Sequence, residues 1–596
     1  MYVAGKGMPL HLEGEERKAK LLELGNYWCE IDYNPATKEQ MKNLMESQQY
    51  SELEKSLVKR IEFGTAGLRS RMAAGFAFMN HITVQQATQG LILYLESLYS
   101  PEQLRQGAVI GFDSRYNSKS FAELAASLFI SHNIPVYLFK KNNPTPFVPF
   151  AVLLKKAIIG IQITASHNPK DDNGYKVYMS NGGQLVDPHD KMIHQSILNN
   201  LDLWLIGGYD STWVRSRVTE IYDEVAETYI ERSLNYSRSR NSNSNSEPIV
   251  YTAMHGVGGE TIKSMWKAWG FSPLVVVDEQ IDPDPEFPTV KFPNPEEGQG
   301  ALALSMKKAS EIGARLVIAN DPDADRMGIA EVQGDGTWRI YSGDEIAVFL
   351  LEWEISHYTD QAPAAVVAST VSSKICKAIA ESIGARFEEV LTGFKWIINK
   401  SLELEGQGYK MLFSFEEAIG FCVGNHVRDK DGILAACVFN ELYQERCASK
   451  GIRLSDHLER LRERYGYYLT RNKYFFCYEP VVIKSVFDNI RQEYPKAIGR
   501  FPVKYIRDLT VGYDNSQPDN KPVLPISPST QMITFTFENG AIITLRTSGT
   551  EPKIKYYCEY HGNTLEDTRA ELNELVDHMI DQLLQPQRYG LTPPSS

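Results

Sequence analysis

A short stretch of the chain, TASHNP at 164–169, places a serine hydroxyl on the loop that follows an apolar run. That run, Ile158 to Ile163, has the pattern of a buried strand. Open α/β sheets place their chemistry at strand ends, so Ser166 is a candidate for covalent catalysis. It does not lie in a G-x-S-x-G elbow, which argues against an esterase. The plain alternative is that Ser166 only caps a following helix.

Three aspartates alternate along a second loop that also follows an apolar run. Asp321, Asp323 and Asp325 are followed at once by Arg326. Carboxylates this close repel one another unless a cation neutralises them, and Mg²⁺ takes few protein ligands and shares the rest with phosphate or water. An EF-hand is excluded because Arg326 and Val332 occupy its Gly and Glu positions. A solvated acidic turn stays open as the alternative.

Further candidate groups lie nearby and in a third loop. Lys176 can act as a general acid or base if neighbouring cations lower its pKa. Glu416 and Glu417 follow another strand-like run and are suited to accept hydrogen bonds from sugar hydroxyls. The charged run that follows them includes Arg428 and Lys430, and alone it is more typical of a solvated face.

A fourth loop, RTSGTEPK at 546–553, combines an arginine, hydroxyls and a glycine. Arginine can contact a phosphate through two nitrogens, and glycine lets the backbone approach it closely. This composition predicts a phosphate-binding loop. Taken alone, the loop is more typical of a polar turn whose arginine forms a surface ion pair.

The composition is that of an ordinary globular protein, with 43% hydrophobic and 23% charged residues among 596. The formal net charge of −13 argues against nucleic acid as a partner. Seven scattered cysteines form no CxxC pair, which indicates reduced thiols. The N-terminus lacks the apolar core of a signal peptide, and no apolar run approaches the ~18–20 residues of a membrane span. We therefore expect a cytoplasmic protein with no membrane association.

Strand-like and helix-like segments alternate along most of the chain, which predicts βαβ units. The length suggests about four domains at ~150 residues each. The tail differs: two alternating runs, 532–537 and 541–545, flank Asn539-Gly540, a strong hairpin signal. A last helix is predicted from a capping box at Thr564 to about Leu584. The polar run SRSRNSNSNS at 237–246 predicts a mobile loop.

Four such loops in this order resemble the α-D-phosphohexomutase superfamily, from GTAGLR at 64–69 to the C-terminal domain. The most similar branch is the animal-type phosphoglucomutase/phosphopentomutase branch, which glucose 1,6-bisphosphate synthase shares. The resemblance implies an α/β protein with four domains around a central cleft: three α/β domains with mixed, mostly parallel sheets and a C-terminal α+β domain. The expected ranges are 1–212 with the phosphoserine loop, 213–340 with the metal-binding loop, 341–460 with the sugar-recognition loop and 461–596 with the phosphate-binding loop.

The resemblance also implies roles for individual residues. Ser166 would be the phosphoserine and, with Asp321, Asp323 and Asp325, would bind Mg²⁺. The other expected catalytic residues are His167, Lys176, Arg69, Arg326 and Lys430. The expected substrate-binding residues are Thr392, Gly393, Lys395, Glu416, Glu417, Arg428, Arg546, Ser548, Gly549 and Thr550.

The implied activity is that of a phosphosugar mutase, an intramolecular phosphotransferase. It would interconvert ribose 1-phosphate with ribose 5-phosphate and glucose 1-phosphate with glucose 6-phosphate, through a phosphoserine and a bisphosphate intermediate. The implied cofactors are Mg²⁺ and glucose 1,6-bisphosphate or ribose 1,5-bisphosphate. Small-molecule sugar phosphates are the expected partners of a monomer, with a dimer left open.

One residue departs from the family pattern. Many hexose-specific members carry a serine after the glutamates, and Ala418 stands there instead. A site that lacks a polar partner discriminates less sharply, so we expect a pentose 1-phosphate to be a good substrate and glucose 1-phosphate to be used as well. The alternative function is a glucose 1,6-bisphosphate synthase that uses 1,3-bisphosphoglycerate. A non-catalytic sensor and a serine phosphatase fit less well, because the reactive residues and the phosphate-binding loop are all present.

Overall fold

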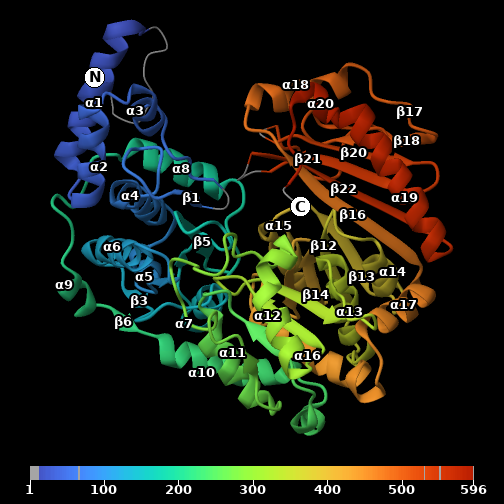
Figure 1. Ribbon diagram of the computed structural model, residues 1–596. Helices are drawn as coiled ribbons and strands as arrows, with labels where there is room; N and C mark the ends of the chain where they lie inside the picture. Colours follow the sequence, from blue (N-terminus) through green and yellow to red (C-terminus); the bar gives the residue numbers. More distant parts are fainter. Residues whose placement is uncertain (1–11, 65–66, 529, 549–551, 595–596) are drawn as a thin grey trace. The chain divides into compact units, whose positions relative to one another are not determined.

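The computed structural model describes residues 12–64, 67–528, 530–548 and 552–594 (Figure 1). The chain divides into two compact units. The first comprises Met1–Ser342, Phe394–Leu402 and Ala418–Gly451, and the second comprises Gly343–Gly393, Glu403–Glu417 and Ile452–Ser596. The four domain ranges expected from the sequence stay a prediction.

The first sheet of the first unit has the strand order β1-β5-β4-β2-β3-β6. Its strands are β1 (Leu68–Arg71), β2 (Ala108–Phe112), β3 (Val136–Leu138), β4 (Ile159–Ile163), β5 (Asp172–Met179) and β6 (Thr219–Glu220). Strands β4, β2, β3 and β6 run parallel, whereas β5 is antiparallel to both β4 and β1. Helices α6 (Ser118–Ser131) and α7 (Phe147–Lys155) pack on it, so β2 and β4 are buried along their whole length.

The second sheet of the first unit has the order β11-β10-β9-β7-β8. Its strands are β7 (Val250–Thr252), β8 (Val275–Val276), β9 (Leu316–Asn320), β10 (Met327–Val332) and β11 (Trp338–Ile340). The parallel strands β8, β7 and β9 are covered by α12 (Gln299–Ile312), while α16 (Gly432–Arg446) packs against β9 and β10. Strand β15 (Gly420–Val423) forms a bridge to this region between Gly420 and Arg326.

The remaining elements of the first unit frame these sheets. Helix α4 (His81–Leu98) packs on α6 and α8, and Trp28 anchors a separate cluster of N-terminal helices. The elements are α1 (Gly14–Ile31), α2 (Pro35–Glu46), α3 (Tyr50–Leu57), α5 (Pro101–Leu104), α8 (His189–Asn199), α9 (Ser211–Arg215), α10 (Tyr222–Ser233), η1 (Leu234–Tyr236), η2 (Arg240–Asn245), α11 (Gly258–Trp269), η3 (Pro295–Glu297) and η4 (Ala448–Lys450). Helix α15 (Phe394–Gly406) begins in this unit.

In the second unit, β12 (Ala364–Ser369) pairs in parallel with β13 (Arg386–Val390) and β14 (Lys410–Glu416). Helices α13 (Gly343–Ser356), α14 (Ile375–Glu381) and α17 (Leu454–Tyr465) surround them. The C-terminal sheet is antiparallel in the order β16-β22-β21-β20-β18-β17, with β19 paired to β18. Its elements are β16 (Tyr467–Phe476), α18 (Pro480–Gln492), β17 (Ala497–Ile498), β18 (Phe501–Asp508), β19 (Tyr513–Asp514), β20 (Met532–Phe537), β21 (Ile542–Thr547), β22 (Lys553–Gly562), α19 (Leu565–Met579), η5 (Ile580–Leu584) and α20 (Pro586–Tyr589).

The fold class expected from the sequence is confirmed, with α/β layers followed by a C-terminal domain of antiparallel strands and helices. The hairpin at Asn539-Gly540 is also confirmed, because Gly540 adopts a φ of +85° between β20 and β21. Thr564 caps α19 through the backbone nitrogen of Asp567 at 3.2 Å. The Asp567 carboxylate accepts from the Thr564 hydroxyl, so the reciprocal half of the expected capping box is absent.

The serine-rich stretch 237–246 differs from the expectation of a mobile loop. It contains η2, and its described side chains bond to neighbouring helices. Ser237 Oγ donates to Glu441 Oε1 at 2.6 Å, and Asn243 donates to both the Trp269 carbonyl and Glu441. A buried carboxylate on α16 thus supplies acceptors that local composition does not reveal. Among the described residues, no helix has both the length and the apolar character needed to cross a membrane.

Asp344, in the first turn of α13, has a buried carboxyl group whose ionisation is opposed by burial. Its Oδ1 accepts from the Ser373 backbone nitrogen at 2.8 Å, while its Oδ2 has no hydrogen-bond partner among the described residues. Burial raises the pKa of Asp344 to about 7, and the nearby carboxylates of Glu559 and Glu417 add to the shift. The group is therefore expected to be protonated in the folded protein well above the pH at which it ionises in the unfolded chain.

We predict that Asp344→Asn flattens the pH dependence of stability. Because the pKa of Asp344 is raised in the folded protein, the contribution of its carboxyl group to the unfolding free energy is fully present below about pH 4. That contribution is lost as the pH rises towards about 7. Relative to the wild type, the variant should gain on the order of 2 kcal/mol in unfolding free energy between pH 5 and pH 8. Urea unfolding at both pH values measures this gain. If the unfolding free energies of the two proteins changed equally with pH, Asp344 would not be protonated in the folded protein over this range.

Candidate functional site

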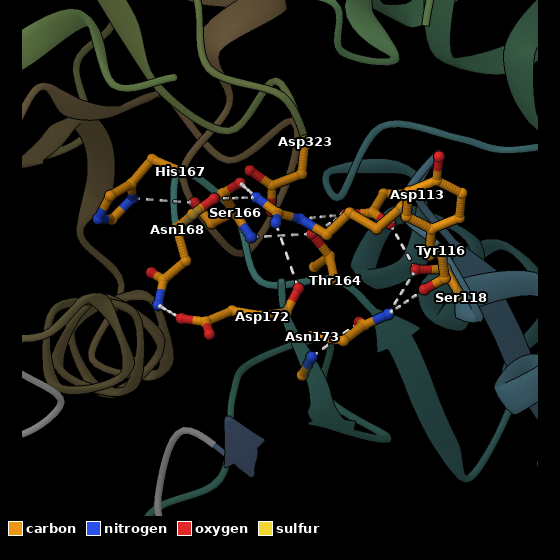
Figure 2. A network of polar contacts seen from close by, with 12 residues as sticks. Asp113, Tyr116, Ser118, Thr164, Ser166, His167, Asn168, Asp172, Asn173 and Asp323 are labelled. Carbon is orange, nitrogen blue, oxygen red and sulfur yellow. Dashed lines mark hydrogen bonds and ion pairs between the residues drawn. The ribbon is translucent and has the colours of Figure 1, made fainter. Parts of the chain in front are cut away.

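Ser166 lies on the loop that follows β4, as the sequence predicts (Figure 2). Its side chain is buried, and its φ of +54° places the backbone in the left-handed region. The Ser166 nitrogen donates to Thr164 Oγ1 at 2.9 Å, and the hydroxyl donates to Asp321 Oδ2 at 2.8 Å. No helix follows, because the chain enters β5 at Asp172, so the helix-cap alternative is wrong.

Arg115 holds the serine loop in this conformation. Its buried guanidinium donates through Nη1 to the Pro169 carbonyl at 2.7 Å and through Nη2 to the carbonyls of Ser166 and Asn168. Asp113 pairs with the same guanidinium at 3.2 Å and accepts from Thr164 Oγ1 at 2.6 Å. One planar guanidinium therefore accounts for the hydrogen bonds of several loop carbonyls at once. It fixes the conformation of a turn that has no regular helix or strand hydrogen bonds of its own.

The three aspartates of the second loop converge in a buried cluster. One carboxylate oxygen of each of Asp321, Asp323 and Asp325 lies within 4.8 Å of the others, and all three side chains are fully buried. Burial and the charges of the two neighbouring carboxylates raise the pKa of Asp321 well above its usual range. Burial opposes ionisation of Asp323 too, but Lys176 and hydrogen bonds hold the pKa of Asp323 below its usual range.

The aspartate cluster suits a divalent cation. Oδ1 of Asp323 and Oδ1 of Asp325 are buried and accept no hydrogen bond from the described residues. Carboxylate oxygens left without donors are costly in a protein interior, and hard cations such as Mg²⁺ bind to oxygen ligands of this kind. The solvated acidic turn is excluded by the burial of all three side chains.

Lys176 lies on β5 beside the aspartates. Its Nζ is 2.8 Å from Asp323 Oδ2 and 3.0 Å from Asp325 Oδ2. Burial acts to lower the pKa of Lys176, but the two carboxylates outweigh it and raise the pKa above its ordinary value. The lowered pKa that the sequence reasoning required is therefore absent, because the charges of Asp323 and Asp325 outweigh that of the neighbouring Lys430.

Lys430 reaches the same aspartates from the loop before α16. Its Nζ is 3.3 Å from Asp325 Oδ2 and 3.6 Å from Asp429 Oδ1. Asp429 is buried and accepts from the hydroxyl of Tyr178 at 2.8 Å. The close approach of this loop depends on Gly432, since a Cβ there would lie 2.2 Å from the Arg326 carbonyl oxygen. The charged run is thus part of a buried site, not a solvated face.

Two arginines and a histidine complete the surroundings of Ser166. Arg69 Nη1 donates to Asn168 Oδ1 at 3.3 Å, and burial lowers the pKa of Arg69. Arg326 Nη1 pairs with Glu296 at 3.0 Å, and its Nε lies 3.9 Å from Asp325 Oδ1. His167 Nδ1 is 3.3 Å from the Ser166 hydroxyl (Figure 2). The structure thus brings the residues expected to be catalytic to the Ser166 loop and the aspartate cluster, and their catalytic roles stay predictions.

Two expected substrate-binding residues of the first unit lie on other segments. Lys395 is half-buried near the start of α15, and burial lowers its pKa to about 8. Arg428 Nη1 donates to the Asn181 carbonyl at 3.0 Å. Neither observation assigns a ligand, so both roles stay predictions.

The other expected substrate-binding residues belong to the second unit. Glu417 accepts from Ser369 Oγ at 2.8 Å, and the Glu416 side chain is largely buried at the end of β14. Arg546 Nη2 donates to the Tyr557 hydroxyl at 3.0 Å. Burial acts to lower the pKa of Arg546, but Tyr557 and the two glutamates outweigh it and raise the pKa above its ordinary value. The other members are Thr392, Gly393 with a φ of +109°, and Ser548, whereas Gly549 and Thr550 lie outside the described residues.

The sequence reasoning missed Asp113, Arg115 and Thr145. Thr145 Oγ1 donates to Asp323 Oδ2 at 2.7 Å. A signal for the first two was present, because Asp113-Ser114-Arg115 directly follows β2, a parallel neighbour of β4. Residues after adjacent parallel strands meet at the same sheet edge. Thr145 gave no comparable signal in the sequence.

We predict that Arg115→Met destabilises the first unit by about 3–5 kcal/mol, because it leaves Asp113 and several carbonyls buried without their partner. The midpoint of urea unfolding measures the loss. Arg500→Met is the control, since that side chain is 55% exposed and solvent screens its ion pairs, so its unfolding midpoint should stay close to that of the wild type. Similar midpoints for both variants would contradict the role of Arg115.

Comparison with known proteins gives a consistent result. Three phosphoglucomutase/phosphomannomutase α/β/α domains match the chain: domain I at residues 60–203, domain II at 227–334 and domain III at 342–465. Among solved structures, the open form of parafusin, a Paramecium phosphoglucomutase, superposes with a TM-score of 0.66 at 17% identity, covering 90% of this chain and 96% of that one. At this identity the likeness concerns the fold alone.

Several relatives match over nearly the whole chain. Human phosphopentomutase is 47% identical, covering 95% of this chain and 96% of that protein. Human glucose 1,6-bisphosphate synthase is 44% identical, covering 95% and 94%. Phosphoribomutase of Saccharomyces cerevisiae is 40% identical, covering 91% and 93%. The chain belongs to the phosphoglucomutase/phosphomannomutase family of the α-D-phosphohexomutase superfamily, on the branch that includes the animal phosphopentomutases and glucose 1,6-bisphosphate synthases.

Proposed function

We propose that this protein is a phosphosugar mutase that interconverts sugar 1-phosphates with the corresponding 5- or 6-phosphates. The observation that carries the proposal is the hydrogen bond between the Ser166 hydroxyl and Asp321, inside a cluster of three buried aspartates and two lysines. A serine that exchanges phosphoryl groups needs cations around it and a fixed position. Relatives named phosphopentomutase and phosphoribomutase, which match nearly the whole chain, support the same activity.

The reaction proceeds in two transfers. Phosphorylated Ser166 gives its phosphoryl group to a free sugar hydroxyl: the bond from phosphorus to Ser166 Oγ breaks, and one to the sugar oxygen forms. The hydroxyl proton leaves to a base, and a sugar bisphosphate results. After the bisphosphate turns round, its other phosphoryl group returns to Ser166: the bond from phosphorus to that sugar oxygen breaks, one to Ser166 Oγ forms, and the sugar oxygen takes up a proton. The activating bisphosphate, with glucose or ribose as its sugar, is therefore the intermediate itself.

The residues around Ser166 supply charge and position. Arg69, which bonds to Asn168, and Arg326, which pairs with Glu296, are our candidates to pair with phosphoryl oxygens, and Arg115 keeps the serine loop fixed. When bound by Asp321, Asp323 and Asp325, Mg²⁺ neutralises phosphate charge. Lys176 is our candidate for moving the proton, with Lys430 as the second. The raised pKa of Lys176 favours the protonated form, which suits a proton donor or a fixed positive charge.

Most of the residues proposed to recognise the sugar and to bind the second phosphate belong to the second unit. Glu416 and Glu417 are carboxylate acceptors for sugar hydroxyls, and Arg546 and Ser548 offer donors to a phosphate. Thr392, Gly393, Lys395 and Arg428 complete the proposed substrate-binding set. Ala418 adds no hydroxyl to this loop, so we propose that ribose 1-phosphate is a good substrate and that glucose 1-phosphate is also used. A monomeric state and a cytoplasmic location also stay predictions.

A glucose 1,6-bisphosphate synthase is the second candidate, favoured by relatives of that name at 44% identity. The first steps would be shared, but 1,3-bisphosphoglycerate would rephosphorylate the serine, and bisphosphate would be the product. An assay with ribose 1-phosphate, glucose 1-phosphate and 1,3-bisphosphoglycerate in parallel separates the two. Rapid isomerisation identifies the mutase, whereas slow isomerisation with net bisphosphate formation identifies the synthase.

We predict that Ser166→Ala abolishes multiple-turnover isomerisation, because the phosphoryl group then has no carrier. The fold should survive, since the change removes only one hydroxyl from a loop held by Arg115. Steady-state rates with Mg²⁺ and a trace of glucose 1,6-bisphosphate measure the effect, and a thermal unfolding curve confirms folding. Near-normal turnover would mean that Ser166 is not the carrier.

We predict that Asp323→Asn weakens Mg²⁺ binding by at least about tenfold, because it removes a charged ligand oxygen. Calorimetric titration of the protein with MgCl₂ measures the affinity independently of activity. Asp32→Asn is the control, because that aspartate is equally buried but bonds to Trp28 and Thr37 instead. Unchanged Mg²⁺ affinity in Asp323→Asn would contradict the metal assignment.

A further inference from the structure

Ser369 and Glu417 lie at the ends of two neighbouring parallel strands of the second unit. Strand β12 ends at Ser369, and Glu417 directly follows β14. The strands are in register through the pairs Val367 with Ser414 and Ala368 with Phe415. Parallel strands bring their carboxyl ends to one edge of the sheet, where ligands bind in α/β proteins. A side chain after β12 can therefore act on a side chain after β14.

The two side chains are joined by a directed hydrogen bond. Ser369 Oγ donates to Glu417 Oε2 at 2.8 Å, and it lies 2.8 Å from Ser372 Oγ. A hydroxyl has a single proton, so Ser369 can donate to Glu417 only if it accepts from Ser372. Both serines are buried, where such a relay of hydroxyls strengthens each bond.

The loop that carries both serines is itself held firmly. The Ser373 nitrogen donates to Asp344 Oδ1 at 2.8 Å, and the Lys374 nitrogen donates to both oxygens of Glu559, at 2.9 and 3.1 Å. Lys374 Nζ folds back onto the carbonyls of Thr370 and Ser372. Because these hydrogen bonds fix the loop, the Ser369 hydroxyl has one position, as a residue that orients another side chain requires.

We propose that Ser369 is a positioning residue for sugar recognition by Glu417, an inference that rests on the proposed mutase function. Its hydroxyl occupies Oε2 and fixes the plane of the carboxylate. Among the described residues, Glu417 Oε1 accepts no hydrogen bond, so this oxygen is left to accept one sugar hydroxyl. Ala418 supplies no hydroxyl to the loop, and the donor that orients the glutamate comes from the neighbouring strand end.

The test is a double-mutant cycle on the full-length protein with ribose 1-phosphate as substrate. Ser369→Ala should raise KM about tenfold, the size expected for losing a hydrogen bond to a charged group, and should change kcat much less. Glu417→Gln should raise KM as well. If Ser369 acts through Glu417, adding Ser369→Ala to Glu417→Gln should change KM by less than about twofold.

Matched variants separate positioning from a general loss of packing. Ser127→Ala removes another buried hydroxyl, which bonds only to the Leu124 carbonyl, and should leave KM unchanged. Ser369→Cys keeps a weaker donor of similar size and should give an intermediate KM, which preserves the test if the alanine variant fails to fold.

A wild-type KM in Ser369→Ala or Ser369→Cys would overturn the proposal, and so would a loss in kcat that leaves KM unchanged. A tenfold effect of Ser369→Ala on KM that persists in the Glu417→Gln background would also overturn it. Failure of the proposed function looks different, because the wild-type protein would then show no isomerisation at all. Isomerisation by the wild type together with additive effects would therefore reject the positioning role alone.

Discussion

The concentration of buried negative charge at Asp321, Asp323 and Asp325 is the constraint on which the rest of the site depends. Three carboxylates within 4.8 Å of one another cannot all stay ionised in a protein interior unless positive charge is brought to them. Lys176 from β5 and Lys430 from the loop before α16 supply part of that charge. Strands and loops from distant parts of the sequence must therefore converge on one loop.

The serine loop meets this cluster under a second constraint. Ser166 adopts a left-handed backbone conformation, and the carbonyls around it belong to no strand or helix. Arg115 satisfies them, and Asp113 compensates the charge of Arg115. The same pair holds Thr164, which accepts from the Ser166 nitrogen. The hydroxyl can then face Asp321 without a helix or strand to fix it, so the geometry around Ser166 is maintained by buried ionic contacts and hydrogen bonds rather than by regular structure.

Much of this arrangement could be predicted from the sequence because its signals are local. An apolar strand followed at once by reactive residues identified the loops of Ser166, Asp321 and Glu416, and Asn539-Gly540 identified the hairpin. What failed depends on distant partners. The serine-rich segment is held by Glu441, about two hundred residues away, and the pKa of Lys176 is set by aspartates from another sheet. Composition and periodicity carry no information about such partners.

The proposed mechanism depends on Ser166 as the carrier of the transferred phosphoryl group. Its most direct measurement is to incubate the protein with Mg²⁺ and ³²P-labelled glucose 1,6-bisphosphate, identify the labelled peptide by mass spectrometry, and then add unlabelled ribose 1-phosphate. We expect label on Ser166 that moves into ribose phosphates as the sugar turns over. Label on another residue, or label on Ser166 that stays in place during turnover, would contradict it.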